Sequence, residues 1–214
     1  MTQRLRITFA KTEAMRFTGH LDLHRTWERT FRRARLPLAY SQGFNPHPRL
    51  NLASALPLGF TSGCEVIDVW LEQEMTPEAV KEALGPALPP GLRVLEIRVI
   101  DPHRPALQSE LEASDFTVTL LEACPDLDAR CQALLQAGSL RRVRREKEYD
   151  LRPLILALEP LPADEQGRAR LFLRMAAREG ATGRPEEVMA ALGISAEETR
   201  THRTRLVFKH VDLE

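Results

Sequence analysis

The order of apolar patterns along the first half of the chain most constrains its fold. Alternating apolar and polar residues, as at Leu5, Ile7 and Phe9, are typical of a half-buried strand, whereas apolar residues three and four positions apart indicate an amphipathic helix. These patterns, with Pro37 ending the first helix, predict strand 4–11, helix 20–35, strand 49–56, strand 64–73, helix 76–84 and strand 92–100. The order β-α-β-β-α-β is that of the split βαβ, or ferredoxin-like, fold. Its two crossover helices cover one sheet face, and we expect the other face to be free for a partner.

A second set of patterns follows the turn-forming residues Asp101–Pro105. It predicts strand 116–121, helix 125–137, strand 140–147, strand 168–176, helix 185–192 and strand 203–209. This set again approximates β-α-β-β-α-β, with an inserted segment near Asp150–Pro162.

We therefore predict an α+β protein of two tandem ferredoxin-like (split βαβ) halves, with antiparallel sheets and helices on one face. The expected domains are residues 1–101 and 115–214, joined by a linker at residues 102–114.

The charge of the whole chain gives no support to nonspecific binding of nucleic acid, because 30 basic and 30 acidic residues leave a formal net charge of zero. A polyanion site must therefore depend on local clusters of basic residues. Three cysteines without a CxxC pair fit a reducing compartment. No run is apolar enough to be a signal core or a membrane span. We expect a cytoplasmic protein without a membrane partner, and no motif predicts a metal or another cofactor.

The first helix and the loop after it hold the most informative cluster of side chains. Leu23, Trp27 and Phe31 share one helix face, and arginines occupy the other face at Arg25, Arg29, Arg32 and Arg33. The loop that follows offers aromatic, amide and basic groups at Tyr40, Ser41, Gln42, Phe44, Asn45, His47 and Arg49.

Together these groups suit a polyanion with stackable bases, which predicts an RNA-binding surface. The helix arginines and Arg49 are expected to contact phosphates. Tyr40 and Phe44 are expected to stack on bases, and Gln42 and Asn45 to bond base edges. The alternative is an ordinary helix that buries one face and leaves the other in water.

Catalytic candidates come from the same region. A metal-independent ribonuclease needs a base near the 2′-hydroxyl and an acid near the leaving oxygen, roles that His20, His47, Tyr40 or Lys11 could fill. The alternative is that His47 only shapes its loop. His20 and His24 have a spacing that can ligate one metal, but no third ligand is apparent.

Two further motifs lie in the second half. Arg141–Lys147 is a dense basic run that can bind phosphate or simply form a solvated strand. In Tyr149–Pro153, Asp150 either caps a short helical turn or, with Arg152, orients the anionic group of a ligand.

Several of these pieces resemble a known bacterial family, the radical-SAM-linked domain of unknown function. The matching pieces are Phe9–Lys11, Gly19–Leu23, Arg32–Ala34, Tyr40–Pro48 and Tyr149–Pro153. The resemblance singles out His20 and Asp22 in the helix, and it singles out loop positions Ser41, Gly43, Asn45 and His47.

The resemblance implies a radical SAM enzyme as partner and a role near RNA processing or modification. The chain has no CxxxCxxC motif to hold an iron–sulfur cluster, so radical chemistry would belong to the partner. The leading interpretation is a non-catalytic RNA-binding adaptor. The alternatives are a metal-independent RNA endonuclease or transferase that uses His20, His47 or Tyr40, and a protein-interaction module that docks on the radical SAM partner.

Overall fold

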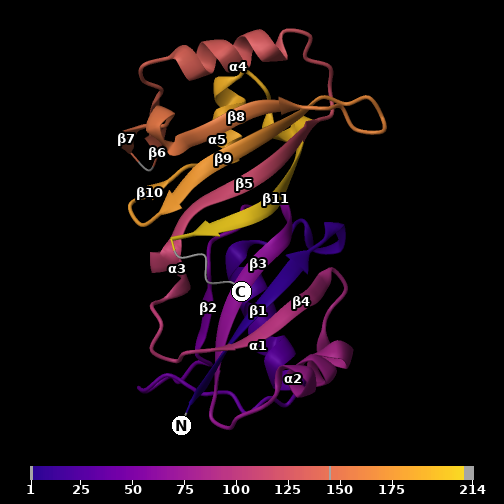
Figure 1. The fold of residues 1–214 in the computed structure, drawn as a ribbon, viewed down its shortest axis with the longest axis vertical. Coiled ribbons are helices and arrows are strands. Elements are labelled where there is room, and N and C mark those ends of the chain that lie inside the picture. The colour runs from indigo at the N-terminus through magenta and orange to yellow at the C-terminus, as the bar shows by residue number, and fades with distance from the viewer. Residues whose placement is uncertain (1, 145, 210–214) are drawn as a thin grey trace. The chain divides into compact units, whose positions relative to one another are not determined.

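The computed structural model describes residues 2–144 and 146–209, and the chain divides into two compact units, residues 1–110 and 111–214 (Figure 1). The first unit contains β1 (Gln3–Lys11), η1 (Glu13–Met15), α1 (His20–Arg33), β2 (Leu50–Leu52), β3 (Thr61–Leu71), α2 (Pro77–Leu84), η2 (Gly85–Ala87), β4 (Leu92–Ile100) and α3 (Leu107–Glu110). Its sheet has the strand order β2-β3-β1-β4, with every neighbouring pair antiparallel. This is the predicted ferredoxin-like arrangement.

One apolar core joins the sheet of the first unit to both crossover helices. Leu5, Ile7 and Phe9 of β1 are buried in it, as the alternation predicts. Trp27 of α1 and Leu84 of α2 are buried in the same cluster, so both helices pack on one sheet face. The second helix begins as its sequence predicts, because the Thr76 hydroxyl accepts a hydrogen bond from the Ala79 N–H and Pro77 follows the cap.

The sheet face of the first unit that the helices leave uncovered was expected to be free for a partner. This prediction is wrong for part of that face. Arg4 and Arg6 on β1 and Asp68 on β3 are buried there. The connecting segment 101–110 covers them, since Arg4 donates hydrogen bonds to the carbonyls of Arg104 and Pro105. α3 and the start of β5 at Leu111 also lie within the region expected to be a linker.

The second unit repeats the topology with additions. It contains β5 (Leu111–Leu120), α4 (Leu127–Gln136), β6 (Arg141–Arg144), β7 (Lys147–Asp150), η3 (Arg152–Leu154), β8 (Ile155–Leu161), β9 (Arg170–Arg178), β10 (Ala181–Thr182), α5 (Pro185–Ala191), η4 (Ala196–Glu198) and β11 (Thr199–Phe208). Its main sheet has the order β8-β9-β5-β11, again entirely antiparallel, and β10 adds to β9. The chain is therefore an α+β protein with the same fold in both units.

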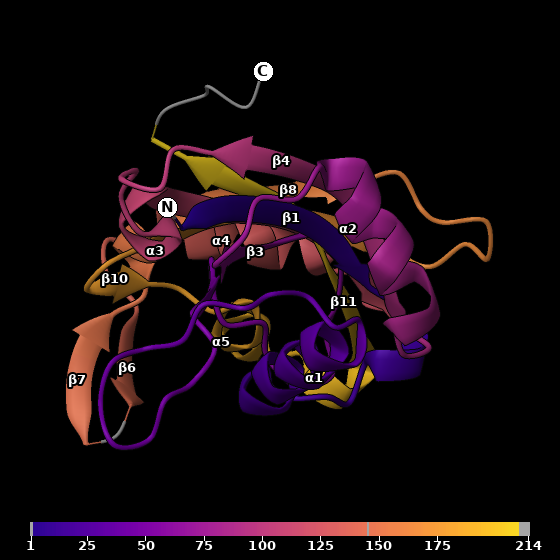
Figure 2. The same ribbon diagram turned by 90° about the horizontal axis from the view of Figure 1, so that it is seen from below.

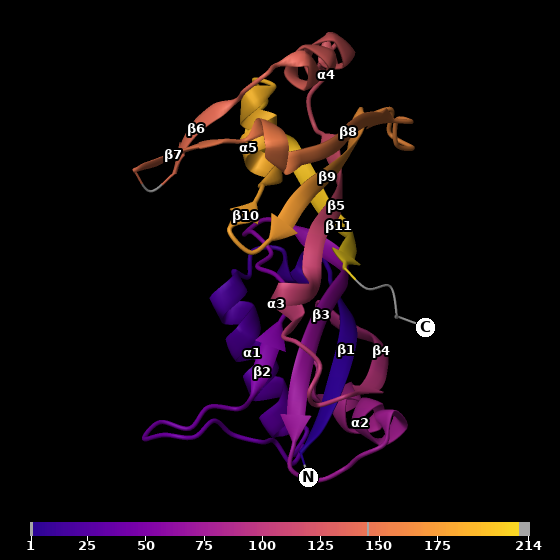
Figure 3. The same cartoon turned by 60° about the vertical axis from the view of Figure 1, so that its left-hand side comes forward.

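One assignment in the second unit is wrong. Residues 140–147 were expected to supply the second strand of the fold, with an insertion near 150–162. Instead β8 is that strand, and the insertion is the β6–β7 hairpin, which stands apart from the main sheet (Figures 2 and 3). Among the described residues, no helix combines the length and apolarity needed to cross a membrane.

Candidate nucleic-acid interface

The outer face of α1 presents a row of exposed arginines. Leu23, Trp27 and Phe31 hold the other face of the helix in the core. The exposed residues are Arg25, Arg29, Arg32 and Arg33, whose spacing places them on adjoining turns. Asp22 lies 3.6 Å from the Arg25 guanidinium, and Glu28 of the same helix pairs with His24. The helix therefore presents a strip with excess positive charge, as the sequence predicts.

The loop after α1 is a hairpin-like projection with a defined base. An antiparallel bridge joins Tyr40 to Pro48. The Ser41 N–H donates to the His47 carbonyl at 2.8 Å, and the Ser41 hydroxyl accepts from the His47 N–H at 3.0 Å. At the tip, Gly43 has a φ of 130°, a conformation that side chains disfavour. Ser41, Gly43 and the backbone of His47 thus shape this loop, which we call the 40–49 loop.

The tip of the 40–49 loop carries an aromatic ring with no covering side chains. Phe44 is fully exposed, and Tyr40 at the base is partly exposed. Gln42, Asn45 and the His47 side chain are exposed as well. An apolar ring held in water at the end of a shaped hairpin is available to stack on a base or to enter a partner.

The loop and α1 lie on the same side of the sheet. Figures 2 and 3 show the loop leaving the C-terminal end of α1 and projecting on the side that the helix occupies. Arg49 is an exception within the predicted set, because its guanidinium lies 4.9 Å from the ring centroid of Trp70. Trp70 pairs with Arg4 on the face opposite the helices. Arg49 is therefore separated from the α1 arginines by the sheet.

The structure keeps His20 and Lys11 away from the loop that holds the other catalytic candidates, Tyr40 and His47. His20 begins α1, whereas the 40–49 loop follows its far end, and fourteen helical residues span about 21 Å. Lys11 lies at the end of β1, about 23 Å along the strand from Arg4, which pairs with Trp70 near the loop base. The Lys11 ammonium is buried and donates to the carbonyls of Arg16 and Phe60. Neither His20 nor Lys11 is therefore placed to share an acid–base site with His47, whereas Tyr40 belongs to the same loop.

His20 and His24 do not gain further ligands. The imidazole of His24 lies 3.5 Å from the Glu28 carboxylate. Within residues 2–144 and 146–209, no group of three or more His, Cys, Asp or Glu side chains is arranged to hold a metal ion.

The Tyr149–Pro153 motif is structural. The Asp150 carboxylate accepts hydrogen bonds from the N–H groups of Leu140 and Arg152, and these bonds lower the pKa of Asp150. The Arg152 guanidinium donates to the carbonyls of Leu135 and Ile155. The motif therefore ties the β6–β7 hairpin to the end of α4. The residue at the N-cap of η3 is Leu151 and not the predicted Asp150, and η3 has no side-chain cap.

The hairpin also packs its tyrosine near an acid that sequence reasoning missed, Glu187. Burial raises the pKa of Tyr149 to about 12, and the nearby carboxylate of Glu187 adds to the shift. Burial likewise raises the pKa of Glu186. Of the predicted basic run, Arg141 is exposed and Arg142 and Arg144 are partly exposed, whereas Arg145 lies outside the described residues.

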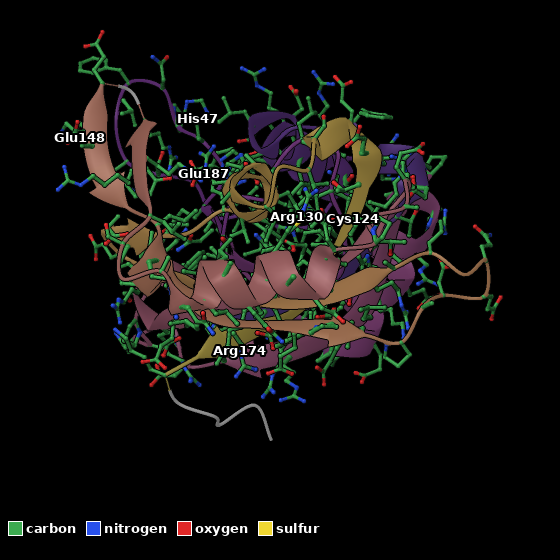
Figure 4. The ribbon with its side chains drawn as sticks, turned by 90° about the horizontal axis from the view of Figure 1, so that it is seen from above. His47, Cys124, Arg130, Glu148, Arg174 and Glu187 are labelled. Atoms are coloured by element: carbon green, nitrogen blue, oxygen red, sulfur yellow. The ribbon has the colours of Figure 1, made fainter. Side chains whose placement is uncertain are left out.

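The two cysteines near α4 differ in their burial. Burial raises the pKa of Cys131 to about 11. Cys124 is half-buried and precedes α4, where it lines a cavity of about 240 Å³ with Arg130 (Figure 4). Burial also raises the pKa of Cys124, so neither thiol has the thiolate character of a nucleophile.

Asp150 gives a testable pH dependence. Its pKa is lower in the folded chain than in the unfolded chain, so its contribution to stability is complete above the unfolded pKa and is lost as the pH falls below about 4. Thermal unfolding by circular dichroism is expected to show a smaller loss of stability on acidification for Asp150→Asn than for the native chain. Equal acid sensitivity of the two proteins would contradict this assignment.

Two solved structures are similar to this chain. One chain of a Cbf5-Nop10-Gar1 complex matches with a TM-score of 0.50 and 12% identity, covering 94% of this chain and 48% of its own length. A chain of an archaeal box H/ACA sRNP Nop10-Cbf5 complex matches with a TM-score of 0.45 and 12% identity, over 94% and 47% of the two chains. The chain thus spans about half the length of these solved chains. At this identity the first likeness shows the fold alone.

No curated protein matches the sequence. The sequence model of a family described as an uncharacterized protein conserved in bacteria (DUF2344) matches residues 4–185. Because that match covers most of both units, the chain belongs to this bacterial family.

Proposed function

We propose that this protein is a non-catalytic RNA-binding adaptor that acts with a radical SAM enzyme in RNA processing or modification. The observation that carries the proposal is the exposed arginine row of α1 on the same side of the sheet as the 40–49 loop with its uncovered Phe44. Arginines supply phosphate contacts, and an exposed ring supplies a stacking surface for a base.

Each group has a distinct role in this proposal. Arg25, Arg29, Arg32 and Arg33 contact backbone phosphates, whose attraction does not depend on sequence. Phe44 and Tyr40 stack on unpaired bases. Gln42 and Asn45 at the tip bond base edges. Arg49, on the other sheet face, would meet a strand only where it passes around the loop base.

Salt dependence tests the phosphate contacts. The double substitution Arg29→Ala/Arg33→Ala is expected to weaken binding of single-stranded RNA. It should also reduce the slope of log affinity against log salt concentration by about 1.4, since each phosphate contact contributes about 0.7. Fluorescence anisotropy over a salt series measures both quantities. Arg93→Ala, an exposed arginine on β4, is the matched control and should leave the slope unchanged. An unaltered slope of log affinity against log salt concentration in the double variant would contradict the proposal.

The radical SAM enzyme is proposed as the partner because of the family resemblance. The chain itself lacks a motif that binds an iron–sulfur cluster. Affinity purification from the bacterial host is expected to recover that enzyme together with RNA. Recovery of RNA alone would remove the adaptor role and leave RNA binding in place. A nuclease that pairs His20 with His47 gains no support from the fold, since these residues lie near opposite ends of α1.

A further inference from the structure

We propose that the second unit carries another binding surface for single-stranded RNA, on the sheet face that α4 and α5 leave uncovered. We call this surface the outer sheet face. It consists of side chains of β5, β8, β9 and β11 that point away from the two helices. The proposal goes beyond the function proposed above, because it concerns different residues in a different unit.

Alternation along the strands defines the two sides of this sheet. Phe116 and Val118 of β5 and Leu173 of β9 are buried, as are Cys131 of α4 and Val188 of α5. These residues form the helix-covered side. The intervening strand positions must point to the other side. The register places them in three cross-strand rows: Arg205, Asp115, Arg174 and Ala157; His202, Thr117, Phe172 and Glu159; Arg200, Thr119, Arg170 and Leu161.

The middle row contains the aromatic ring. Phe172 is only half-buried, and its neighbour across the strand pair is the small Thr117. Part of this residue is therefore open to solvent. The Arg174 guanidinium lies 5.8 Å from the centre of this ring, close enough for a cation–π contact.

The rows on either side are basic. Arg200 and Arg205 of β11 are exposed, and Arg170 of β9 is partly exposed. Arg174 donates two hydrogen bonds to Asp115, at 2.7 and 2.8 Å, through Nε and Nη2. That bidentate pair fixes the guanidinium and leaves its Nη1 protons for another acceptor. Figure 4 marks Arg174 on the second unit.

The acids on this face are fewer than the bases. Asp115 is paired with Arg174, and Glu159 lies on β8 across from Phe172. Four arginines thus face two carboxylates. An aromatic row between two basic rows matches a strand whose phosphates contact the outer rows while a base stacks on the middle row. A folded acidic protein has no need of the accessible ring, so the arrangement favours single-stranded RNA.

Substitution of Phe172 tests the stacking step. The probe is a short fluorescein-labelled single-stranded oligouridylate, titrated into the full-length chain at low salt. Phe172→Ala is expected to weaken binding between about 5-fold and 150-fold, the range that loss of one stacked base produces. Phe172→Tyr keeps the ring and should bind within about twofold of the native chain. Circular dichroism of both variants checks that the fold is retained.

Pairing this experiment with the α1 double variant separates the two proposals. If Phe172→Ala weakens binding while Arg29→Ala/Arg33→Ala does not, the result supports RNA binding at the outer sheet face and contradicts RNA binding at α1. If Phe172→Ala binds as the native chain does, the inference is overturned, whatever the α1 variant shows. Lack of oligouridylate binding by the native chain at low salt also overturns it, and would assign the face to a protein partner. Arg200→Ala/Arg205→Ala provides an independent variant and should lower the salt slope.

Discussion

Replacing Asp68 by alanine is expected to lower the free energy of unfolding of the first unit by about 3–5 kcal/mol, the usual effect of removing one member of a buried ion pair. Asp68 is 0% exposed. Its carboxylate accepts hydrogen bonds from both Arg4 and Arg6, with distances between 2.5 and 3.1 Å. Without it, two buried guanidinium groups lose their main counter-charge. Glu110 offers only a 3.7 Å contact with Arg6, which is too long to replace the lost hydrogen bonds.

Tryptophan fluorescence makes this measurement specific to one unit. Both tryptophans of the chain, Trp27 and Trp70, belong to the first unit, so urea unfolding followed by their emission reports that unit alone. Glu96→Ala is the matched control, because it removes a carboxylate that pairs with Arg98 at 2.6 Å on the surface. Exposed pairs contribute about 1 kcal/mol or less. Similar losses for Asp68→Ala and Glu96→Ala would show that the buried network does not hold the segment 101–110 on the sheet.

Replacing Trp27 by alanine is expected to lower the free energy of unfolding of the first unit by about 3–5 kcal/mol, because a large cavity would open beneath α1. Trp27 is fully buried between two rings. Phe9 meets it edge-on with ring centres 4.8 Å apart, and Phe31 stacks on it at 5.0 Å. These ring contacts hold α1, which carries the arginine row, against the sheet. The RNA affinity of the Trp27→Ala variant should therefore fall as the temperature rises and the first unit unfolds.

Trp27→Phe is the informative control for this prediction. The indole Nε1 has no hydrogen-bond partner among the described residues, so phenylalanine loses packing but no hydrogen bond. Trp27→Phe should lower the free energy of unfolding by less than half as much as Trp27→Ala, because most of the ring contacts remain. Emission of the remaining Trp70 follows unfolding in both variants. A phenylalanine variant as unstable as the alanine variant would indicate an essential polar contact at Nε1.

Local patterns predicted the fold because most strands and helices obey their own periodicity. Leu171 and Leu173 alternate with Arg170 and Arg174, and β9 follows that pattern. The error at β8 has a physical cause. Its sequence, Ile155–Leu161, shows weak alternation and contains Pro160, a residue that sheets tolerate mainly in edge strands. Alternation identifies a strand but not its partner, so it could not tell the hairpin from the sheet.

The candidate site was predictable only where a single element determined it. Helical spacing was enough to place Arg25 and Arg29 on one exposed face. The side of Arg49 depends on the register of β2 against β3, which local sequence does not specify. The separation of His20 from His47 depends on the direction in which α1 crosses the sheet. The outer sheet face was not predictable from β9 alone, because Phe172 is an apolar residue between the core residues Leu171 and Leu173 and so does not stand out as exposed.

The attachment of the β6–β7 hairpin makes it a natural place for protein engineering. The chain leaves and re-enters the second unit at one point, because the Leu151 N–H donates to the Leu140 carbonyl at 2.9 Å. Lengthening a loop whose ends are already joined adds little closure entropy. A peptide tag or a fluorophore inserted between β6 and β7 should therefore leave both ferredoxin-like sheets in register. Such a labelled chain would allow binding at either surface to be followed without altering a residue of either one.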